Sequence, residues 1–152
     1  MNRSSYTIGR TFIGRLPAGI DLLEGLTRIA NEEEIAVGRI EVYGSVGALA
    51  LTVQNQETRF AEQIREERGF EIATLGGTIS LFKRRSLPRL SGLFVAADGT
   101  ERGGTLALGT ITHACEAVIT ELTGRALSRD FDMETGLALW KNALLLEEGN
   151  RE

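Results

Sequence analysis

Glycine punctuates this sequence from residue 35 onward, and short runs of β-branched and aromatic residues fill the spaces between the glycines. The runs read "IAVGRIEVYGSV", "ALALTVQ", "GFEIATLGG", "TISLF", "LSGLFVAADG" and "GGTLALGTITHACEAVITEL". Such runs are typical of β-strands separated by tight turns or bulges. Upstream, "YTIGRTFIGRL" predicts one more strand, which ends before Pro17. The pattern restricts the chain to folds with a large β component.

One amphipathic helix is expected before these strands, in the segment "PAGIDLLEGLTRIANEEE". Its apolar residues recur at spacings of three and four, which places them on one helix face: Ile20, Leu23, Leu26, Ile29 and Ala30. A helix followed by many strands predicts an α+β fold whose helix covers a mostly antiparallel sheet. The last segment, "GLALWKNALLLEEGNRE", is interpreted as a strand that passes into a short helix, and its apolar density favours an interface.

The composition favours a globular protein. Hydrophobic residues make up 42% and charged residues 25% of the 152 residues, both near the globular average. Cys115 is the only cysteine, so no internal disulfide can form and a reducing, cytoplasmic location is expected. No apolar run reaches the roughly 18 residues of a membrane helix, so we expect no membrane partner.

Positive charge is concentrated in one region of a chain whose net charge is −4. Residues 81–105 contain five bases, namely Lys83, Arg84, Arg85, Arg89 and Arg102, against Asp98 and Glu101. A local basic patch on an acidic protein argues only weakly for nucleic-acid binding. For the segment Lys83 to Arg85 a solvated loop is favoured over a DNA contact.

Two glycine pairs, Gly76–Gly77 and Gly103–Gly104, are not phosphate-binding loops, because neither precedes a helix that begins with Lys and Ser or Thr. We interpret them as turn or bulge glycines. The stretch "DGTERGG" indicates a hairpin, in which Asp98 and Gly99 would both adopt positive φ angles.

His113 and Cys115 stand two residues apart in a predicted strand and would share one face with Ala117 and Ile119. Zinc requires three or four ligands, and one histidine with one cysteine could reach that number only through symmetry. A packed core pair is therefore favoured, with no metal and no cofactor. Cys115 lies in an apolar strand, where a thiol is usually inert.

Two carboxylates, Glu71 and Glu116, lie within otherwise apolar strands, where an unpaired charge is costly. Each must face solvent, a cleft or a positive partner. Ion pairs with Arg15, Arg39 or Arg129 are favoured over acid–base chemistry, and no catalytic residue can be assigned.

In order along the chain, the segments "GRLPAGIDLLEGLTRIA", "IAVGRIEVYGSVGALAL", "RGFEIATLGGTISL", "DGTERGGTLALG" and "EAVITELTGRALSRDFDMETGLALW" together resemble the PPC domain, which is shared by plants and prokaryotes. The resemblance spans about residues 10–140 and implies that residues 1–152 form a single PPC-like domain. It implies an α+β fold of about seven mainly antiparallel strands, in a curved or barrel-like sheet with flanking helices, similar to acetolactate decarboxylase. It also implies a homotrimer. Because the sequence has no R-G-R-P hook, we expect the stand-alone prokaryotic type.

Many prokaryotic members of this family carry a His-x-His pair before an acidic turn and a third histidine after paired glycines, a three-histidine metal site. At the matching positions this chain has Arg89, Ser91 and Thr105. Arginine cannot bind a cation and hydroxyls are poor zinc ligands, so the resemblance implies a lost metal site. The same three residues would favour an anion such as a carboxylate or phosphate. The alternative is that mutational drift removed the ligands of an unused site and left a polar surface without a function.

The function favoured by these observations is a homotrimeric, cytoplasmic, non-enzymatic binding or interaction module. The family has an "RFEIL"-like motif that is implicated in protein contacts among plant members. In this chain the motif is matched by Phe70, Glu71 and Ile72. Two alternatives remain open. One is an enzyme or small-anion sensor that uses Arg89, Ser91 and Thr105 with Glu71 and Glu116, and the other is weak DNA association through Lys83, Arg84 and Arg85.

Overall fold

The computed structural model describes residues 3–149, which form nine strands and one helix. In chain order these are β1 (Thr7–Leu16), α1 (Leu22–Glu32), β2 (Gly38–Gln54), β3 (Ala61–Glu66), β4 (Phe70–Phe82), β5 (Arg85–Val95), β6 (Glu101–Leu106), β7 (Ile111–Thr123), β8 (Ser128–Asp132) and β9 (Leu137–Trp140). No helix within residues 3–149 has the length and apolar character that crossing a membrane requires.

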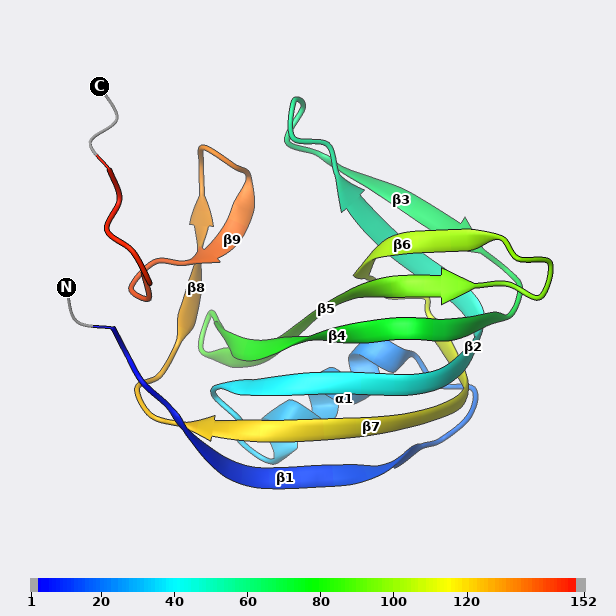
Figure 1. The fold of residues 1–152 in the computed structure, drawn as a ribbon, viewed down its shortest axis with the longest axis horizontal. Helices are drawn as coiled ribbons and strands as arrows, with labels where there is room; N and C mark the ends of the chain where they lie inside the picture. Colours follow the sequence, from blue (N-terminus) through cyan, green and yellow to red (C-terminus); the bar gives the residue numbers. More distant parts are fainter. Residues whose placement is uncertain (1–2, 150–152) are drawn as a thin grey trace.

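All nine strands belong to one curved sheet (Figure 1) with the order β1-β7-β2-β6-β5-β4-β8-β9. Strand β2 is the centre of this arrangement, because it also pairs with β3 and β4. The β4–β8 pairing is parallel, and the other pairings are antiparallel. The expected antiparallel sheet is therefore confirmed, although with a single helix in the described part of the chain the fold is closer to all-β than to α+β.

The structure has nine strands rather than the roughly seven that the family resemblance implies, and the strand limits differ from those expected from the sequence for two physical reasons. Glycine does not interrupt β2 or β4, so pairs of predicted strands merge into single strands of 17 and 13 residues. Strands β3, with the sequence "AEQIRE", and β8, with "SRDFD", were not predicted because they have few apolar residues. Backbone pairing with β2 holds β3 in the sheet, and backbone pairing with β4 holds β8 there. The side-chain pattern of a segment does not reveal such pairing.

Helix α1 packs one face onto the sheet. Leu22, Leu26 and Ala30 are fully buried there. Asp21 caps the helix, because its Oδ1 accepts a hydrogen bond from the Glu24 backbone N at 3.0 Å. Its other oxygen accepts from the Gly109 backbone N at 2.7 Å, which ties the start of the helix to the loop before β7. The predicted helix face is confirmed for Leu26 and Ala30.

The glycine pairs lie inside strands β4 and β6 rather than in turns. Gly77 is paired with Leu90 of β5, and a side chain at Gly77 would collide with the Arg89 carbonyl. Gly77 therefore permits close approach of β4 and β5. The sequence pattern instead predicts that this glycine is part of a turn or bulge. At the β5–β6 turn, Gly99 has a φ of 86°, whereas Asp98 is not among the residues with positive φ.

A bulge in β7 separates two residues that the sequence places on one face. The register between β2 and β7 shifts between Ser45 and Val46, opposite His113. His113 is consequently exposed, whereas Cys115 is fully buried and donates a hydrogen bond to the Ser45 carbonyl at 3.1 Å. The shared face is confirmed for Cys115 and its buried neighbours on β7 and is wrong for His113.

Strands β8 and β9 form a hairpin at the end of the sheet where residues 3–6 and 141–149 also lie (Figure 1). Residues 141–149 form turns and irregular structure, so the short helix expected there does not form. Trp140, the last residue of β9, is partly buried and donates its indole Nε1–H to Ser80 Oγ at 3.0 Å.

Candidate functional site

Arg89, Ser91 and Thr105 lie on one face of the sheet. Arg89 and Ser91 are two residues apart on β5, and Ser91 pairs directly with Thr105 of β6. Thr105 in turn pairs with Thr52 of β2, which extends the polar row across a third strand. The structure therefore brings the three predicted residues together, while Leu90 between them points into the core.

A pocket of about 300 Å³ lies between this polar face and the β8–β9 hairpin. It is lined by Thr52, Gln54, Arg59, Ala61, Leu87, Pro88, Arg89, Thr105, Gly136 and Leu137. Two of the three predicted residues, Arg89 and Thr105, line it, and Ser91 does not. The lining contains two arginines and no carboxylate, so the chemistry of this pocket favours an anion.

Arg129 on β8 is the buried cation next to this pocket, with 9% of its surface exposed. Its Nη1 donates to the Ala138 carbonyl at 3.0 Å, and Arg89 Nη1 donates to the same oxygen at 3.3 Å. Arg129 also donates from Nε to Ser80 Oγ at 3.1 Å, and its guanidinium lies 4.6 Å from the centroid of the Trp140 ring. Burial lowers the pKa of Arg129, and the positive charge of Arg89 lowers that pKa further.

The carboxylates Glu71 and Glu116 do not meet. Both are exposed, and they pair with Ser45 and Tyr43 respectively, on opposite sides of β2. Within residues 3–149 neither forms an ion pair, although Glu116 stands beside Arg15 in register. Glu71 instead lines a separate hollow of about 570 Å³, together with exposed His113.

No set of three or more His, Cys, Asp or Glu side chains within the described part of the chain gathers as metal ligands do. At the three positions to which the family resemblance assigns ligands, the donors are a guanidinium and two hydroxyls. A guanidinium offers only N–H donors, and neutral hydroxyls bind zinc poorly. This donor set does not fit a divalent transition metal.

Lys83 and Arg84 form the two-residue tip of the β4–β5 hairpin, because Phe82 pairs with Arg85. Their φ angles are 49° and 67°, the left-handed region that such a turn requires and that Asn and Gly adopt most easily. Lys83, Arg84 and Arg85 are all exposed. None of the three forms an ion pair with a carboxylate of residues 3–149, and the Lys83 ammonium lies 5.3 Å from the Phe82 ring centroid.

Two other charges of the predicted basic region, Asp98 and Arg102, form ion pairs with residues outside it. Arg68 bridges Glu66 at 2.6 Å and Asp98 at 3.0 Å, and Arg102 pairs with Glu66 at 2.8 Å. A backbone hydrogen bond from Thr100 and the nearby Arg68 guanidinium lower the pKa of Asp98. Unpaired positive charge therefore remains at the β4–β5 tip and around Arg89.

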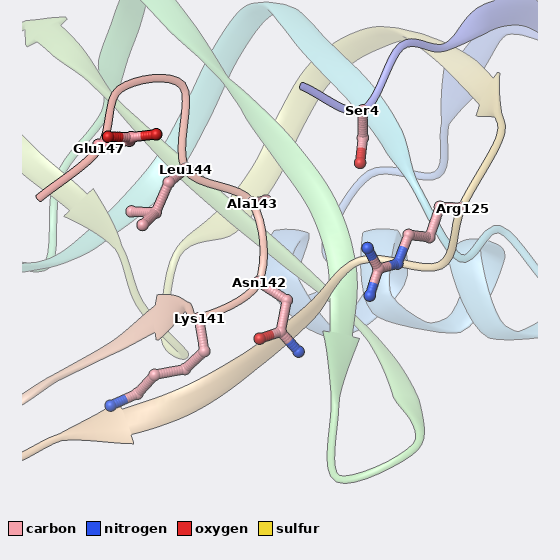
Figure 2. A pocket seen from close by; sticks show the side chains of 7 residues that line it. All are labelled: Ser4, Arg125, Lys141, Asn142, Ala143, Leu144 and Glu147. Atoms are coloured by element: carbon pink, nitrogen blue, oxygen red, sulfur yellow. The ribbon is translucent and has the colours of Figure 1, made fainter. Parts of the chain in front are cut away.

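A further hollow of about 440 Å³ lies among residues 4, 125 and 141–147 (Figure 2). It is lined by the carboxylate of Glu147 and by two cations, Arg125 and Lys141. Figure 2 shows that their head groups do not converge, and Lys141 is directed toward Asp132, 3.7 Å away. We therefore regard the pocket beside Arg89 as the better candidate site.

Sequence reasoning alone did not assign Arg59 or Thr52 to the site, and it placed Arg129 in an ion pair. Arg59 follows β2 in a turn with a φ of 65°, and its Nη1 donates to the Met133 carbonyl at 3.2 Å. The pairing order β2-β6-β5 brings Arg59 into the same pocket as Arg89, and the β8–β9 hairpin brings Arg129 beside Arg89. No local pattern carries that information.

Over residues 3–149 these features define a β-rich fold with one helix, a polar sheet face and an arginine-lined pocket beside the β8–β9 hairpin. The model of the Plants and Prokaryotes Conserved domain, abbreviated PCC or PPC, matches residues 3–123, and the chain belongs to this family. The matched residues include Arg89 and Thr105 but end before Arg129. A comparison with curated proteins finds no match.

Solved structures share the fold over nearly their whole length. A protein of Archaeoglobus fulgidus described as metal-containing is 28% identical, with a TM-score of 0.86 over 92% of this chain and 99% of that one. A PPC protein of Pyrococcus horikoshii is 24% identical, with a TM-score of 0.88 over 95% of this chain and 100% of that one. A Bacteroides thetaiotaomicron protein, described as a candidate DNA-binding protein, is 23% identical, with a TM-score of 0.80 over 92% and 98% of the two chains.

Proposed function

We propose that this chain is a cytoplasmic, non-enzymatic PPC-domain binding module that assembles as a homotrimer and makes weak, salt-sensitive contacts to nucleic acid through the β4–β5 tip. The conformation of the tip carries this proposal. Lys83 and Arg84 both occupy the left-handed region, which costs non-glycine residues on the order of 1–3 kcal/mol each. Both side chains are exposed and form no ion pair within residues 3–149, so their charges are free to contact phosphate.

The affinity expected for this contact is low. The chain carries a net charge of −4, and the acids outside the tip repel phosphate. We expect duplex DNA to bind in the nonspecific range, about 10⁻⁴–10⁻⁶ M at physiological salt. A trimer would present three tips, which raises the effective affinity for a long polyanion. The Bacteroides relative described as a candidate DNA-binding protein supports the same direction.

The test replaces the tip by the residues that the turn prefers. The double variant Lys83→Asn/Arg84→Gly should raise Tm by about 2–4 °C for each kcal/mol of relieved backbone strain. The same variant should bind a fluorescent duplex more weakly and lower the slope of log K against log salt by up to about 0.9 for each lost phosphate contact.

A matched control removes two exposed cations elsewhere, in the variant Arg15→Gln/Arg28→Gln. It changes net charge by the same amount and leaves the tip intact. Equal losses of DNA affinity in both variants would show that only net charge matters and would overturn a role for the tip.

The second candidate function is a small-anion sensor that uses the pocket beside Arg89. The observation that favours it is the carboxylate-free lining of that pocket. This candidate relies on different residues from the tip, so the two functions can be tested separately.

A further inference from the structure

Arg129 of the β8–β9 hairpin is a buried cation that forms no ion pair with a carboxylate of residues 3–149. Arg129 is 9% exposed, and within residues 3–149 its partners are neutral: the Ser80 and Thr78 hydroxyls, the Ala138 carbonyl and the Trp140 ring. A buried ion without a counterion is costly, and buried charges in proteins are normally paired. Retaining Arg129 therefore points to a partner that lies outside this chain.

A second arginine increases this imbalance. Arg89 Nη1 and Arg129 Nη1 share the Ala138 carbonyl oxygen, at 3.3 and 3.0 Å, which holds two like charges close together. Like charges repel, and they repel more strongly away from water. An anion bound next to both guanidinium groups would convert this repulsion into attraction.

The pocket beside Arg89 has the size and the lining for such an anion. Its volume of about 300 Å³ suits a small organic molecule. Arg89 and Arg59 supply guanidinium groups, and Thr52 and Thr105, paired across β2 and β6, supply hydroxyls. Neither hydroxyl has a hydrogen-bond partner within residues 3–149, so both can donate to a ligand oxygen.

The apolar part of the pocket lining narrows the class of ligand. Leu87, Pro88 and Leu137 form an apolar wall, which an aliphatic carbon skeleton would contact. These features fit a small organic anion better than a bare inorganic ion.

We propose that the pocket between the β5–β6 face and the β8–β9 hairpin binds a small organic oxyanion, a carboxylate or a phosphate ester. Its anionic group is held by Arg89 and Thr105, and buried Arg129 reinforces the positive field from below. Arg59 closes the other side. The ligand stabilises the hairpin on the sheet because it neutralises the arginines on both. This inference rests on the small-anion candidate function and names its ligand class and residues, and it does not depend on the Lys83–Arg84 tip or on nucleic-acid binding.

The experiment is isothermal titration calorimetry with succinate, inorganic phosphate and glycerol phosphate at fixed ionic strength. Chloride, added as sodium chloride, is the reference anion. We expect saturable binding of succinate or glycerol phosphate and an increase in Tm that saturates with it. Preference for succinate assigns a carboxylate ligand, and preference for glycerol phosphate assigns a phosphate ester. No saturable heat and no increase in Tm with any of these anions would overturn the proposal.

Two variants locate the site. Arg89→Gln should weaken binding by about 10- to 100-fold, because it removes a charged hydrogen-bond donor. Thr105→Val keeps the shape and suits a strand, so it should fold normally and weaken binding by about 2- to 10-fold. The control Arg15→Gln removes an exposed arginine of β1 and should bind as the parent does. If Arg89→Gln and Arg15→Gln have equal effects, the anions bind elsewhere and the proposal is wrong.

One further outcome would assign a different partner to Arg89 and Arg129. If Arg89→Gln dissociates an oligomer and the parent shows no ligand response, the arginines pair with a carboxylate of another copy of the chain. That result would also overturn the small-molecule site. Measuring molar mass for the same variants by light scattering separates these outcomes.

Discussion

At the residue scale, Gly77 shows how one missing side chain positions the site. A Cβ at this position would meet the carbonyl of Arg89, which is backbone and cannot turn aside. We expect Gly77→Ala to push β5 away from β4 and to lower Tm by several degrees, since steric strain of this kind costs about 1–3 kcal/mol. Thermal unfolding checks this.

The control for that variant is Gly14→Ala on β1, where an added Cβ has no neighbour within 4 Å. It should leave Tm nearly unchanged or raise it slightly, because alanine has less freedom in the unfolded chain. Similar losses in both variants would show that the close approach of β4 and β5 is not what requires glycine at position 77.

A single carboxylate should give the protein a visible acid dependence. The pKa of Asp98 is lowered in the fold, chiefly by the Thr100 backbone N–H and then by Arg68. The unfolded chain therefore binds more protons as pH falls, and the stability from Asp98 is present above about pH 4 and lost below it. Asp98→Asn should lower Tm at pH 7, and its difference from the parent should shrink progressively as pH falls from 4 toward 2.

Thermal scans from pH 7 to pH 2 test this convergence. Glu62→Gln on β3, an exposed carboxylate without a hydrogen bond among residues 3–149, is the control and should run parallel to the parent at every pH. A constant gap between parent and Asp98→Asn across the range would mean that the charge of Asp98 contributes nothing.

The sequence predicted the burial of a residue correctly where the alternation along its own strand determines that burial. The prediction failed where a register shift between two strands determines it. The alternation along β7 correctly buries Cys115, but the bulge opposite His113 turns that side chain to solvent. A bulge depends on the partner strand, which a single strand's pattern does not describe. Arg129 was expected in an ion pair for a similar reason, because its neighbours come from β4 and β9.

At the element scale, strong apolar patterns predicted the elements and weak ones did not. Strand β1 matches its expected limits, and helix α1 lies within its expected segment although it begins at Leu22, after Ile20, because Pro17 and the apolar periodicity agree there. Strand β3 escaped prediction because it lies against β2 with mostly charged and polar side chains. The three residues that the family resemblance groups together lie on one sheet face, since a hairpin brings β5 and β6 into register.

That register supports a prediction about metal. Arg89 and Ser91 share a face of β5, and Ser91 pairs with Thr105. Three histidines at these positions would point the same way and supply the minimum number of zinc ligands. We expect the triple variant Arg89→His/Ser91→His/Thr105→His to bind zinc and to gain Tm from it, whereas each single variant does not.

Elemental analysis of the purified parent and variants decides this. We expect no stoichiometric zinc in the parent, because its guanidinium and hydroxyl groups are poor ligands. One equivalent in the parent would show that another set of residues holds metal. A triple variant without zinc would mean that the backbone no longer keeps these positions at coordinating distance.

At the scale of the whole molecule, apolar surface is left uncovered on the β1 side of the sheet. Strand β1 is an edge strand, and its Ile8 and Ile13 are 76% and 78% exposed. Tyr43 on β2 adds a further side chain that is 52% exposed. An exposed apolar edge strand invites pairing or aggregation unless a partner covers it.

We expect three copies of the chain to cover this surface, with a mass in solution near three times the 16.5 kDa of one chain. Multi-angle light scattering at micromolar concentration measures this mass directly. The variant Ile13→Asp places a charge in the expected interface and should lower the mass, because burying an unpaired carboxylate is costly. Val53→Asp, at a 44% exposed position near the end of β2 away from the β1 edge, is the control and should keep the parent mass. A monomer mass for the parent would contradict the trimer, and a trimer unaffected by Ile13→Asp would place its interface on another face.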